Sequence, residues 1–213
     1  MSVAPLKIMP IGDSITAGVE FINNKSTCEN GGYRTHLWRF LQKDGLAVEF
    51  VGTQSDGPPD ISVRHEGHPG WNTSQILQDI PHWLMKYDVQ IALIMTGTND
   101  IIQIQDANIA IGRLYSLIDK IFEIRPEIRL ALASIPPLKW SESRKHLQSI
   151  VISYNTKIYS LICEYVSKGM RISYVDIFNG LDKQHMFGSH PSPSGYQKIA
   201  EIWYPILRNL IIQ

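Results

Sequence analysis

The stretch Leu6-Lys-Ile-Met-Pro-Ile-Gly-Asp-Ser-Ile-Thr-Ala-Gly18 passes from an apolar run directly into a tight turn. The apolar run has the length of a strand, and its nearly continuous apolar character is typical of strands covered on both faces, as parallel sheets require. Four further runs of this kind recur along the chain, each bounded by Gly, Pro, Asp or Asn. The five predicted strands are residues 6–11, 47–51, 89–95, 129–135 and 171–175.

Segments with helical periodicity lie between these strands. The clearest is 106–124, in which Ile109, Leu114 and Ile121 fall on one stripe and Pro126 follows the end. The other predicted helices are residues 33–43, 74–86, 147–166 and 194–210. Because strands and helices alternate, we predict a right-handed, doubly wound, three-layer α/β/α sandwich that forms a single domain over residues 1–213.

The composition excludes several classes of protein. The 213 residues include 20 Lys and Arg and 20 Asp and Glu without a basic block, so the electrostatic footprint of a nucleic-acid or anionic-membrane binder is missing. No apolar run approaches the roughly 20 residues that cross a bilayer. The first seven residues lack the pattern of a secretory signal, so we expect a cytoplasmic protein. Cys28 and Cys163 match no zinc or redox spacing and are expected to be free thiols.

The turn after the first predicted strand carries Ser14 at its tip. Ligands bind outside the carboxyl ends of the strands in such sheets, which places this hydroxyl where a nucleophile is needed. Asp13-Ser14 before a helix is also an ordinary capping sequence, so the turn alone leaves both interpretations open. The hydrolase pattern G-x-S-x-G fails because position 16 is Thr, and the glycine-rich nucleotide-binding patterns are absent.

Two further loops are predicted to reach the same edge of the sheet. Residues 96–100 follow the third strand, and the amide of Asn99 could donate to an oxyanion, although Asn and Asp also stabilise turns by bonding their own backbone. Residues 188–191 precede the last helix and include His190. A single histidine on a loop, without the other two loops, would not indicate a functional site. A serine, an amide and a histidine at one edge together match the needs of an acyl-transfer site.

Four short blocks resemble those of the SGNH, or GDSL, hydrolases: Gly-Asp-Ser at 12–14, Gly70, Gly-Thr-Asn-Asp at 97–100 and His-Pro at 190–191. The resemblance covers nearly the whole chain, from residue 8 to about residue 203. Within that superfamily, the acetylxylan-esterase-type carbohydrate esterases are also similar to this chain at residues 31–34, 50–54 and 66–71. The resemblance implies a five-stranded flavodoxin-like sheet and hydrolysis of O-acetyl esters on sugars.

The resemblance also implies a role for one residue in each block. Ser14 is similar to the family nucleophile, and its own N–H would be one donor of the oxyanion hole. The backbone N–H of Gly70 and the side-chain amide of Asn99 are similar to the other two donors, and His190 is similar to the general base. Removing one such donor can lower the rate by about 10²–10³.

Further residues are expected beside the substrate: Asp13, His68, Trp71 and Asp100, with Trp140 near the same pocket. For Asp13 and Asp100 the alternative is that they hold turns by hydrogen bonding. The segment 65–68, His-Glu-Gly-His, lacks the two residues that separate Glu from the second His in the zinc helix motif. We therefore expect neither a metal nor another cofactor.

Phe187 departs from the family pattern, which places Asp three residues before the histidine. Three alternatives stay open: a backbone carbonyl orients the imidazole of His190, another carboxylate such as Asp182 or Glu66 does so, or catalysis is weak. We favour a carbonyl-assisted Ser-His dyad, in which His190 Nδ1 lies within about 3.2 Å of a main-chain oxygen.

The sequence therefore predicts a serine esterase that removes a short acyl group, acetyl in the first instance, from a small acylated substrate such as a carbohydrate ester. One alternative is a thioesterase or lysophospholipase, which would need an apolar groove for a longer acyl chain. The other is a non-hydrolytic relative that binds an acetylated sugar, for which Phe187 is the only support. The oligomeric state is not predicted.

Overall fold

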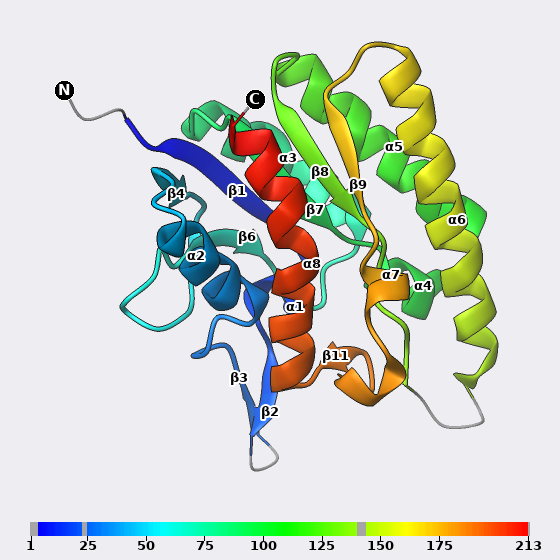
Figure 1. Ribbon diagram of the computed structural model, residues 1–213. Coiled ribbons are helices and arrows are strands. Elements are labelled where there is room, and N and C mark those ends of the chain that lie inside the picture. The colour runs from blue at the N-terminus through cyan, green and yellow to red at the C-terminus, as the bar shows by residue number, and fades with distance from the viewer. Residues whose placement is uncertain (1–3, 23–24, 140–143, 213) are drawn as a thin grey trace.

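A parallel sheet lies between two layers of helices (Figure 1). The computed structural model describes residues 4–22, 25–139 and 144–212. Parallel pairs join the main strands in the order β4, β1, β7, β8, β9, which is the order of flavodoxin-like sheets. Their bounds are Val48–Phe50 (β4), Leu6–Gly12 (β1), Ile91–Met95 (β7), Arg129–Ala133 (β8) and Ile172–Val175 (β9). The predicted three-layer α/β/α fold is confirmed.

Two short strands share the position on the other side of β1 from β7. β4 pairs with the first half of β1, and β6 (Arg64–Gly67) pairs in parallel with its end, where Gly12 lies opposite Gly67. β5 (Gln54–Ser55) adds an antiparallel pair to β6, which gives a seven-stranded sheet. The five predicted strands are all present, as β1, β4, β7, β8 and β9, but the sheet has two strands more than predicted. β6 has the sequence Arg-His-Glu-Gly, so no apolar run marks it as a strand.

The five predicted helices are present, each within two residues of its expected bounds. α2 and α8 cover one face of the sheet, and α3, α5 and α6 cover the other. Polar side chains begin two of them: Asn72 forms a capping box with Gln75, and Asp106 accepts from the first turn of its helix. The bounds are Tyr33–Lys43 (α2), Thr73–Lys86 (α3), Ala107–Ile124 (α5), His146–Ser167 (α6) and Pro193–Ile212 (α8).

The strand β7 shows why one apolar run serves both faces of the sheet. Successive side chains of a strand point to opposite faces. Leu93 and Met95 accordingly join the core under α2 and α8, whereas Ala92 and Ile94 join the core under α3, α5 and α6. All four are buried, and full burial of one large apolar side chain stabilises a fold by about 1.5–3 kcal/mol.

Three short helices begin where strands end, at the edge where a site was expected. The sequence did not predict them, because segments of four to seven residues show no helical periodicity. They are α1 (Ser14–Ala17), α4 (Thr98–Ile104) and α7 (Ile177–Gly180), and the same edge carries β2 (Glu20–Ile22), β3 (Lys25–Thr27), η2 (Lys183–His185), β10 (Met186–Phe187) and β11 (His190–Pro191). In the described parts of the chain, no helix has the length and apolarity that crossing a membrane requires.

Arg34 of α2 is fully buried and ties separate segments together. Its Nε and Nη2 atoms donate to the carbonyl oxygens of Thr16 and Ala17, at 2.8 and 3.0 Å, where α1 ends. Its Nη1 and Nη2 atoms donate to the carbonyl oxygens of Val63 and Asp56, at 3.0 and 2.8 Å. Burial lowers the pKa of Arg34 to about 10, so the guanidinium is still charged at neutral pH.

We predict that Arg34→Lys lowers the free energy of unfolding by about 3 kcal/mol or more, because an ammonium group cannot reach four carbonyl oxygens in a planar fork and each buried acceptor left unpaired costs about 1–3 kcal/mol. Urea unfolding would measure the change. The matched control is Arg39→Lys on the same helix, where the exposed pair with Asp60 is worth at most about 1 kcal/mol. Equal effects of the two substitutions would contradict this account of Arg34.

Candidate active site

The hydroxyl of Ser14 and the imidazole of His190 meet at the carboxyl edge of the sheet. Ser14 is the first residue of α1, directly beyond β1, and His190 lies on β11 before α8 (Figure 1). Ser14 Oγ and His190 Nε2 are 2.9 Å apart, a normal hydrogen-bond distance. The fold thus joins two side chains that are 176 positions apart in the geometry of a nucleophile and its base.

The turn that carries Ser14 is fixed by its neighbours. Asp13 caps α1 by accepting a hydrogen bond from the N–H of Ile15 at 2.9 Å. Gly12 leaves no space for a side chain, since a Cβ there would lie 2.3 Å from the carbonyl oxygen of Met95. The first N–H groups of a helix have no intrahelical acceptor, so the N–H of Ser14 is available to a ligand.

Gly70 occupies a tight turn after β6. The N–H of Trp71 donates to the carbonyl oxygen of His68 at 3.1 Å, so Pro69 and Gly70 form the middle of the turn. Gly70 has a φ of 84°, a left-handed conformation that favours glycine. Within the described parts of the chain, the N–H of Gly70 makes no hydrogen bond to the protein, which leaves this donor for a ligand.

Asn99 lies in the first turn of α4, directly after β7. Its Nδ2 atom donates to the carbonyl oxygen of Trp71 at 2.7 Å, which links α4 to the turn of Gly70. A side-chain amide nitrogen carries two N–H groups. The bond to Trp71 therefore fixes the amide and leaves its second N–H for a ligand.

One cleft of about 630 Å³ is lined by all four residues expected to act chemically: Ser14, Gly70, Asn99 and His190. The sequence did not predict the rest of the lining, most of which belongs to or adjoins the β2–β3 hairpin. Three-residue strands give no periodic signal from which this wall could be found. These further lining residues are Val19, Phe21, Ser26, Thr27, Cys28, Asp56 and Pro69.

The second nitrogen of His190 contacts a hydroxyl. Ser189 Oγ lies 3.3 Å from His190 Nδ1, and no backbone carbonyl of the described residues bonds to this nitrogen, whereas we expected one from the sequence. The reason is local, because the turn between β10 and β11 folds the neighbouring serine side chain back onto the ring. Burial lowers the pKa of His190 below its ordinary value of 6.5, so the imidazole is neutral at neutral pH.

The two carboxylates considered as partners of His190 are engaged elsewhere. Glu66 is buried, and its Oε2 atom accepts from Thr53 Oγ1 at 2.8 Å and lies 2.9 Å from His68 Nε2. Asp182 is exposed, and its carboxylate lies 3.5 Å from the amide of Gln184. Among the described residues, His190 therefore pairs with Ser14 and has no carboxylate on its Nδ1.

Asp13 and Asp100 lie behind the cleft and are not among the described residues that line it. Burial raises the pKa of Asp13 to about 7, although the bond from Ile15 opposes this shift. Asp100 accepts from the N–H and Oγ1 of Thr73, both at 2.8 Å, and from Nη1 of Arg113 at 2.9 Å. The structure therefore places both carboxylates where they hold turns, and it does not bring them to a substrate.

His68 and Trp71 stack with Trp83 of α3. The His68 ring lies 4.1 Å from the Trp71 ring and 5.0 Å from the Trp83 ring, nearly parallel to both. Neither His68 nor Trp71 is among the described residues that line the cleft. Because they are the two ends of the turn that carries Gly70, the stack positions that turn. Trp140, also expected near the pocket, lies outside the described residues.

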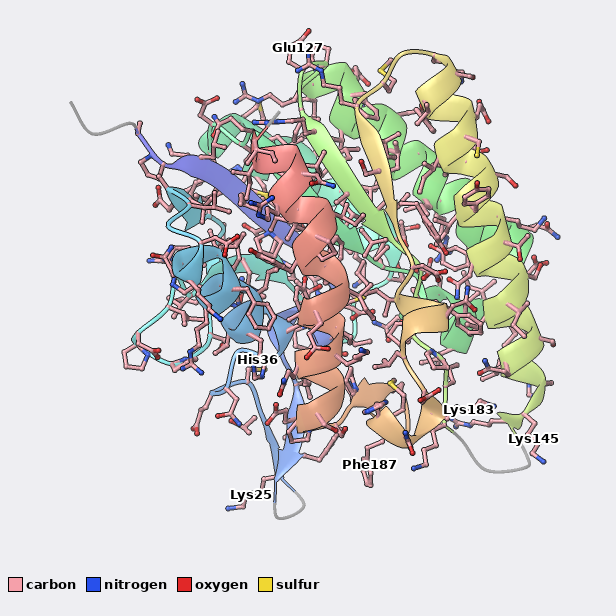
Figure 2. The ribbon with its side chains drawn as sticks, viewed as in Figure 1. Lys25, His36, Glu127, Lys145, Lys183 and Phe187 are labelled. Atoms are coloured by element: carbon pink, nitrogen blue, oxygen red, sulfur yellow. The ribbon has the colours of Figure 1, made fainter. Side chains whose placement is uncertain are left out.

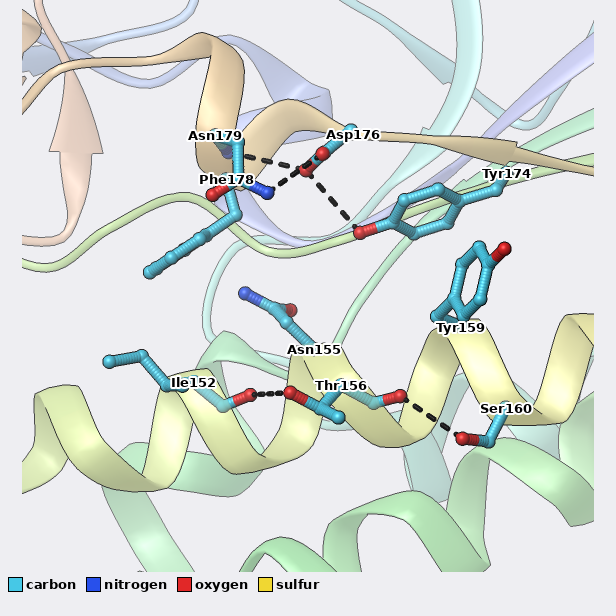
Figure 3. Close-up of a pocket in the computed structure, with 9 residues that line it drawn as sticks. All are labelled: Ile152, Asn155, Thr156, Tyr159, Ser160, Tyr174, Asp176, Phe178 and Asn179. Atoms are coloured by element: carbon cyan, nitrogen blue, oxygen red, sulfur yellow. Dashed lines mark hydrogen bonds between the residues drawn. The ribbon is translucent and has the colours of Figure 1, made fainter.

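A separate hollow of about 410 Å³ lies between α6 and the segment from β9 to α7 (Figure 3). Tyr159, Tyr174 and Asp176 are among its lining residues, and Asp176 accepts from the N–H of Asn179 at 3.2 Å to cap α7. No histidine lines this hollow in the described structure. Over residues 4–22, 25–139 and 144–212, no group of three or more His, Cys, Asp or Glu side chains could hold a metal ion.

A serine paired with a neutral histidine beside free N–H donors, at the carboxyl edge of an α/β/α sandwich, has the geometry of an ester hydrolase. Residues 11–198 match the GDSL-like lipase/acylhydrolase family, and the chain belongs to this family. It is accordingly an ester hydrolase of the SGNH type.

Solved structures and a curated relative add detail to this assignment. A family 3 carbohydrate esterase of Clostridium thermocellum is 33% identical, with 97% of this chain and 98% of that one covered and a TM-score of 0.79. An acetyl esterase mutant crystallised with acetate ion is 25% identical at the same coverage, with a TM-score of 0.82. A multidomain esterase of Ruminococcus flavefaciens is 29% identical over 93% of this chain, which spans only 28% of that relative.

We predict that kcat/KM for ethyl acetate falls as the pH drops through the pKa of His190, because only the neutral imidazole can take a proton from Ser14. Burial lowers this pKa, so the midpoint of the acid limb should lie below pH 6.5. Phe187 pairs directly with His190 across β10 and β11. The carboxylate introduced by Phe187→Asp should therefore raise the pKa of His190 and move the limb upward by about one pH unit.

The same substitution should raise kcat at pH 8 by about tenfold, a small part of the roughly 10⁴ that the triad carboxylate supplies in serine proteases. The matched control is Phe187→Asn, which has nearly the same shape but no charge and should leave the acid limb where it is. If the acid limb of the kcat/KM profile has the same midpoint in Phe187→Asp as in the wild type, residue 187 does not act on the imidazole.

Proposed function

We propose that this protein is a serine esterase that removes short acyl groups, acetyl above all, from a carbohydrate. The observation that carries the proposal is the 2.9 Å contact between Ser14 Oγ and His190 Nε2 in a cleft that Gly70 and Asn99 also line. The family assignment supports ester hydrolysis in general. The residue roles and the substrate below are inferences from this geometry.

In the first half of the reaction, His190 Nε2 takes the proton of Ser14 as Oγ attacks the ester carbonyl carbon. The carbonyl oxygen becomes negatively charged and is stabilised by the N–H of Ser14, the N–H of Gly70 and Nδ2 of Asn99. When the tetrahedral intermediate collapses, the bond to the alcohol oxygen breaks and His190 returns the proton to that oxygen. The products of this half are the free alcohol and an acyl-Ser14 enzyme.

In the second half, a water molecule attacks the acyl carbon of the acyl-enzyme while His190 accepts its proton. The same three donors stabilise the second oxyanion. Collapse breaks the bond to Ser14 Oγ, which regains its proton from His190, and the carboxylic acid leaves. Atoms and charges therefore balance with one water consumed for each ester bond broken.

The hydroxyl of Ser189 can accept the Nδ1–H of His190 at 3.3 Å and so favour the tautomer in which Nε2 is free to act as a base. It adds no negative charge to stabilise the imidazolium that forms during attack. A Ser-His dyad of this kind should turn over more slowly than a triad with a carboxylate.

The acetyl and carbohydrate parts of the proposal rest on the relatives. The similar structures include a carbohydrate esterase and an acetyl esterase with acetate. A thioesterase or lysophospholipase that acts on longer chains is the competing enzyme class, and a non-hydrolytic acetyl-sugar binder is the competing binding protein. A cytoplasmic location stays a prediction of the sequence, which cell fractionation would test.

We predict that a serine-directed phosphonate labels Ser14, and that Ser14→Ala abolishes both labelling and ester hydrolysis. The matched control is Ser26→Ala, since Ser26 lines the same cleft without a histidine partner and its loss should leave labelling intact. Over a p-nitrophenyl panel from acetate to decanoate, acetate should be preferred to octanoate by about tenfold or more, because each methylene that does not fit is worth about 1–3 kcal/mol.

Three outcomes of this experiment contradict parts of the proposal. Labelling that survives Ser14→Ala would exclude Ser14 as the nucleophile. Peak activity on octanoate or longer esters would favour the thioesterase or lysophospholipase class. A folded wild-type protein without Ser14-dependent hydrolysis of any ester would favour the non-hydrolytic binder.

We predict that Asn99→Ala lowers kcat for p-nitrophenyl acetate by about 10²–10³, because one oxyanion donor is lost. KM should change much less, since the ester carbonyl carries little charge before attack. The control is Asn72→Ala, which removes a partly buried amide that caps α3 and should affect stability rather than kcat. A kcat effect of similar size in both variants would mean that Asn99 acts through the fold and not through the oxyanion.

A further inference from the structure

Two exposed phenylalanine rings lie together beside the cleft. Phe21 on β2 is 49% exposed and Phe187 on β10 is 68% exposed, and their ring centroids are 6.0 Å apart. Figure 2 shows the Phe187 side chain projecting from the fold into solvent. Single exposed apolar residues are common, but contacting ones at the rim of a cleft are typical of a ligand-binding surface.

The two rings also extend the cleft beyond the catalytic pair. Phe21 lines the main cleft, and it also lines a smaller adjoining cavity of about 150 Å³ together with Phe187. The remaining lining of this cavity mixes apolar and polar groups: Glu20, Pro191, Ser192 and Pro193. A ligand that fills the cleft can therefore continue across the Phe21 ring onto Phe187.

The position of Phe21 shows which half of an ester meets this surface. The Phe21 and His190 rings form an edge-to-face pair, with centroids 5.2 Å apart and planes at 74°. His190 must return a proton to the alcohol oxygen, so the alcohol half of the ester lies beside His190. The carbonyl oxygen instead points to Gly70 and Asn99. Phe21 and Phe187 are therefore placed to contact the alcohol and not the acyl chain.

We propose that Phe21 and Phe187 form a binding platform for a sugar ring in the alcohol half of the substrate. This inference rests on the proposed function. A pyranose ring presents a flat face of C–H groups that packs on aromatic rings, while its hydroxyl groups stay in water or reach polar neighbours such as Ser192. The open platform suits a ring that belongs to a longer saccharide, because a small alcohol would leave both phenyl rings uncovered.

The test compares kcat/KM for an acetylated xylo-oligosaccharide with kcat/KM for ethyl acetate, whose alcohol is too small to cover the platform. Phe187→Ala and Phe21→Ala should each lower this ratio by about fivefold to tenfold through a higher KM for the oligosaccharide. Phe187→Trp keeps an aromatic ring at this position and should therefore have the ratio of the wild type. The matched control is Tyr159→Ala. Tyr159 is an aromatic residue of α6 that is 57% exposed but lines the separate hollow, so this variant should have the same ratio of kcat/KM values as the wild type.

Calorimetric titration with the deacetylated xylo-oligosaccharide provides a readout that does not depend on catalysis. The wild type should bind it, and Phe187→Ala should bind it about fivefold to tenfold more weakly. Equal ratios and equal affinities in wild type and both alanine variants would overturn the platform while leaving the esterase in place. Loss of discrimination between ethyl acetate and ethyl octanoate in these variants would overturn it too, because the rings would then contact the acyl chain.

If the proposed esterase function is wrong, these experiments give results that differ from those that overturn the platform. A wild-type protein that hydrolyses neither ester but binds the oligosaccharide through Phe187 would retain the platform and refute the esterase. A protein that neither hydrolyses nor binds would refute both.

Discussion

The buried guanidinium of Arg34 holds the turn from which Ser14 projects. α1 has only four residues, and a helix this short is not stable by itself because nucleation is unfavourable. The two bonds from Arg34 satisfy carbonyl oxygens at its end, and its other two bonds fasten the loop that leads into β6. The position of Ser14, the proposed nucleophile, therefore depends on a cation that lies on a different helix, α2.

The proposed oxyanion donors Gly70 and Asn99 are held in the same manner, by buried polar groups that are themselves bonded. The carbonyl oxygen of Trp71 receives the amide of Asn99, and Asp100 next to it receives two hydrogen bonds from Thr73 at the start of α3. The turn of Gly70 and the start of α4 thus form one unit. Donors fixed before a ligand arrives need no reorganisation as charge develops, which is the condition for effective stabilisation of an oxyanion.

Residue 187 on β10 could serve either of two roles, and one side chain cannot serve both. It pairs directly with His190, so an acid there would support the proposed base, and a ring there extends the surface that we propose meets the alcohol half of a substrate. This chain has the ring, and among the described residues a serine hydroxyl, not a carboxylate, contacts the imidazole. With the proposed roles, the arrangement favours contact with the substrate over charge stabilisation of the base.

The sequence by itself determined the layered fold and indicated that the loops with Ser14, Asn99 and His190 share one edge, because continuous apolar runs mark strands buried on both faces and the loops after them must meet there. Gly70 was expected only from the resemblance to a family block. The sequence could not find β6, whose residues are polar, or the wall formed by Phe21, whose strand is too short to show a period. Only the tertiary structure decided what touches His190 Nδ1 and where Asp13, His68 and Asp100 lie. Those outcomes depend on contacts between segments that are distant in the sequence and on the direction of individual side chains. The strands and helices, by contrast, could be predicted because the pattern of buried residues repeats within each short segment.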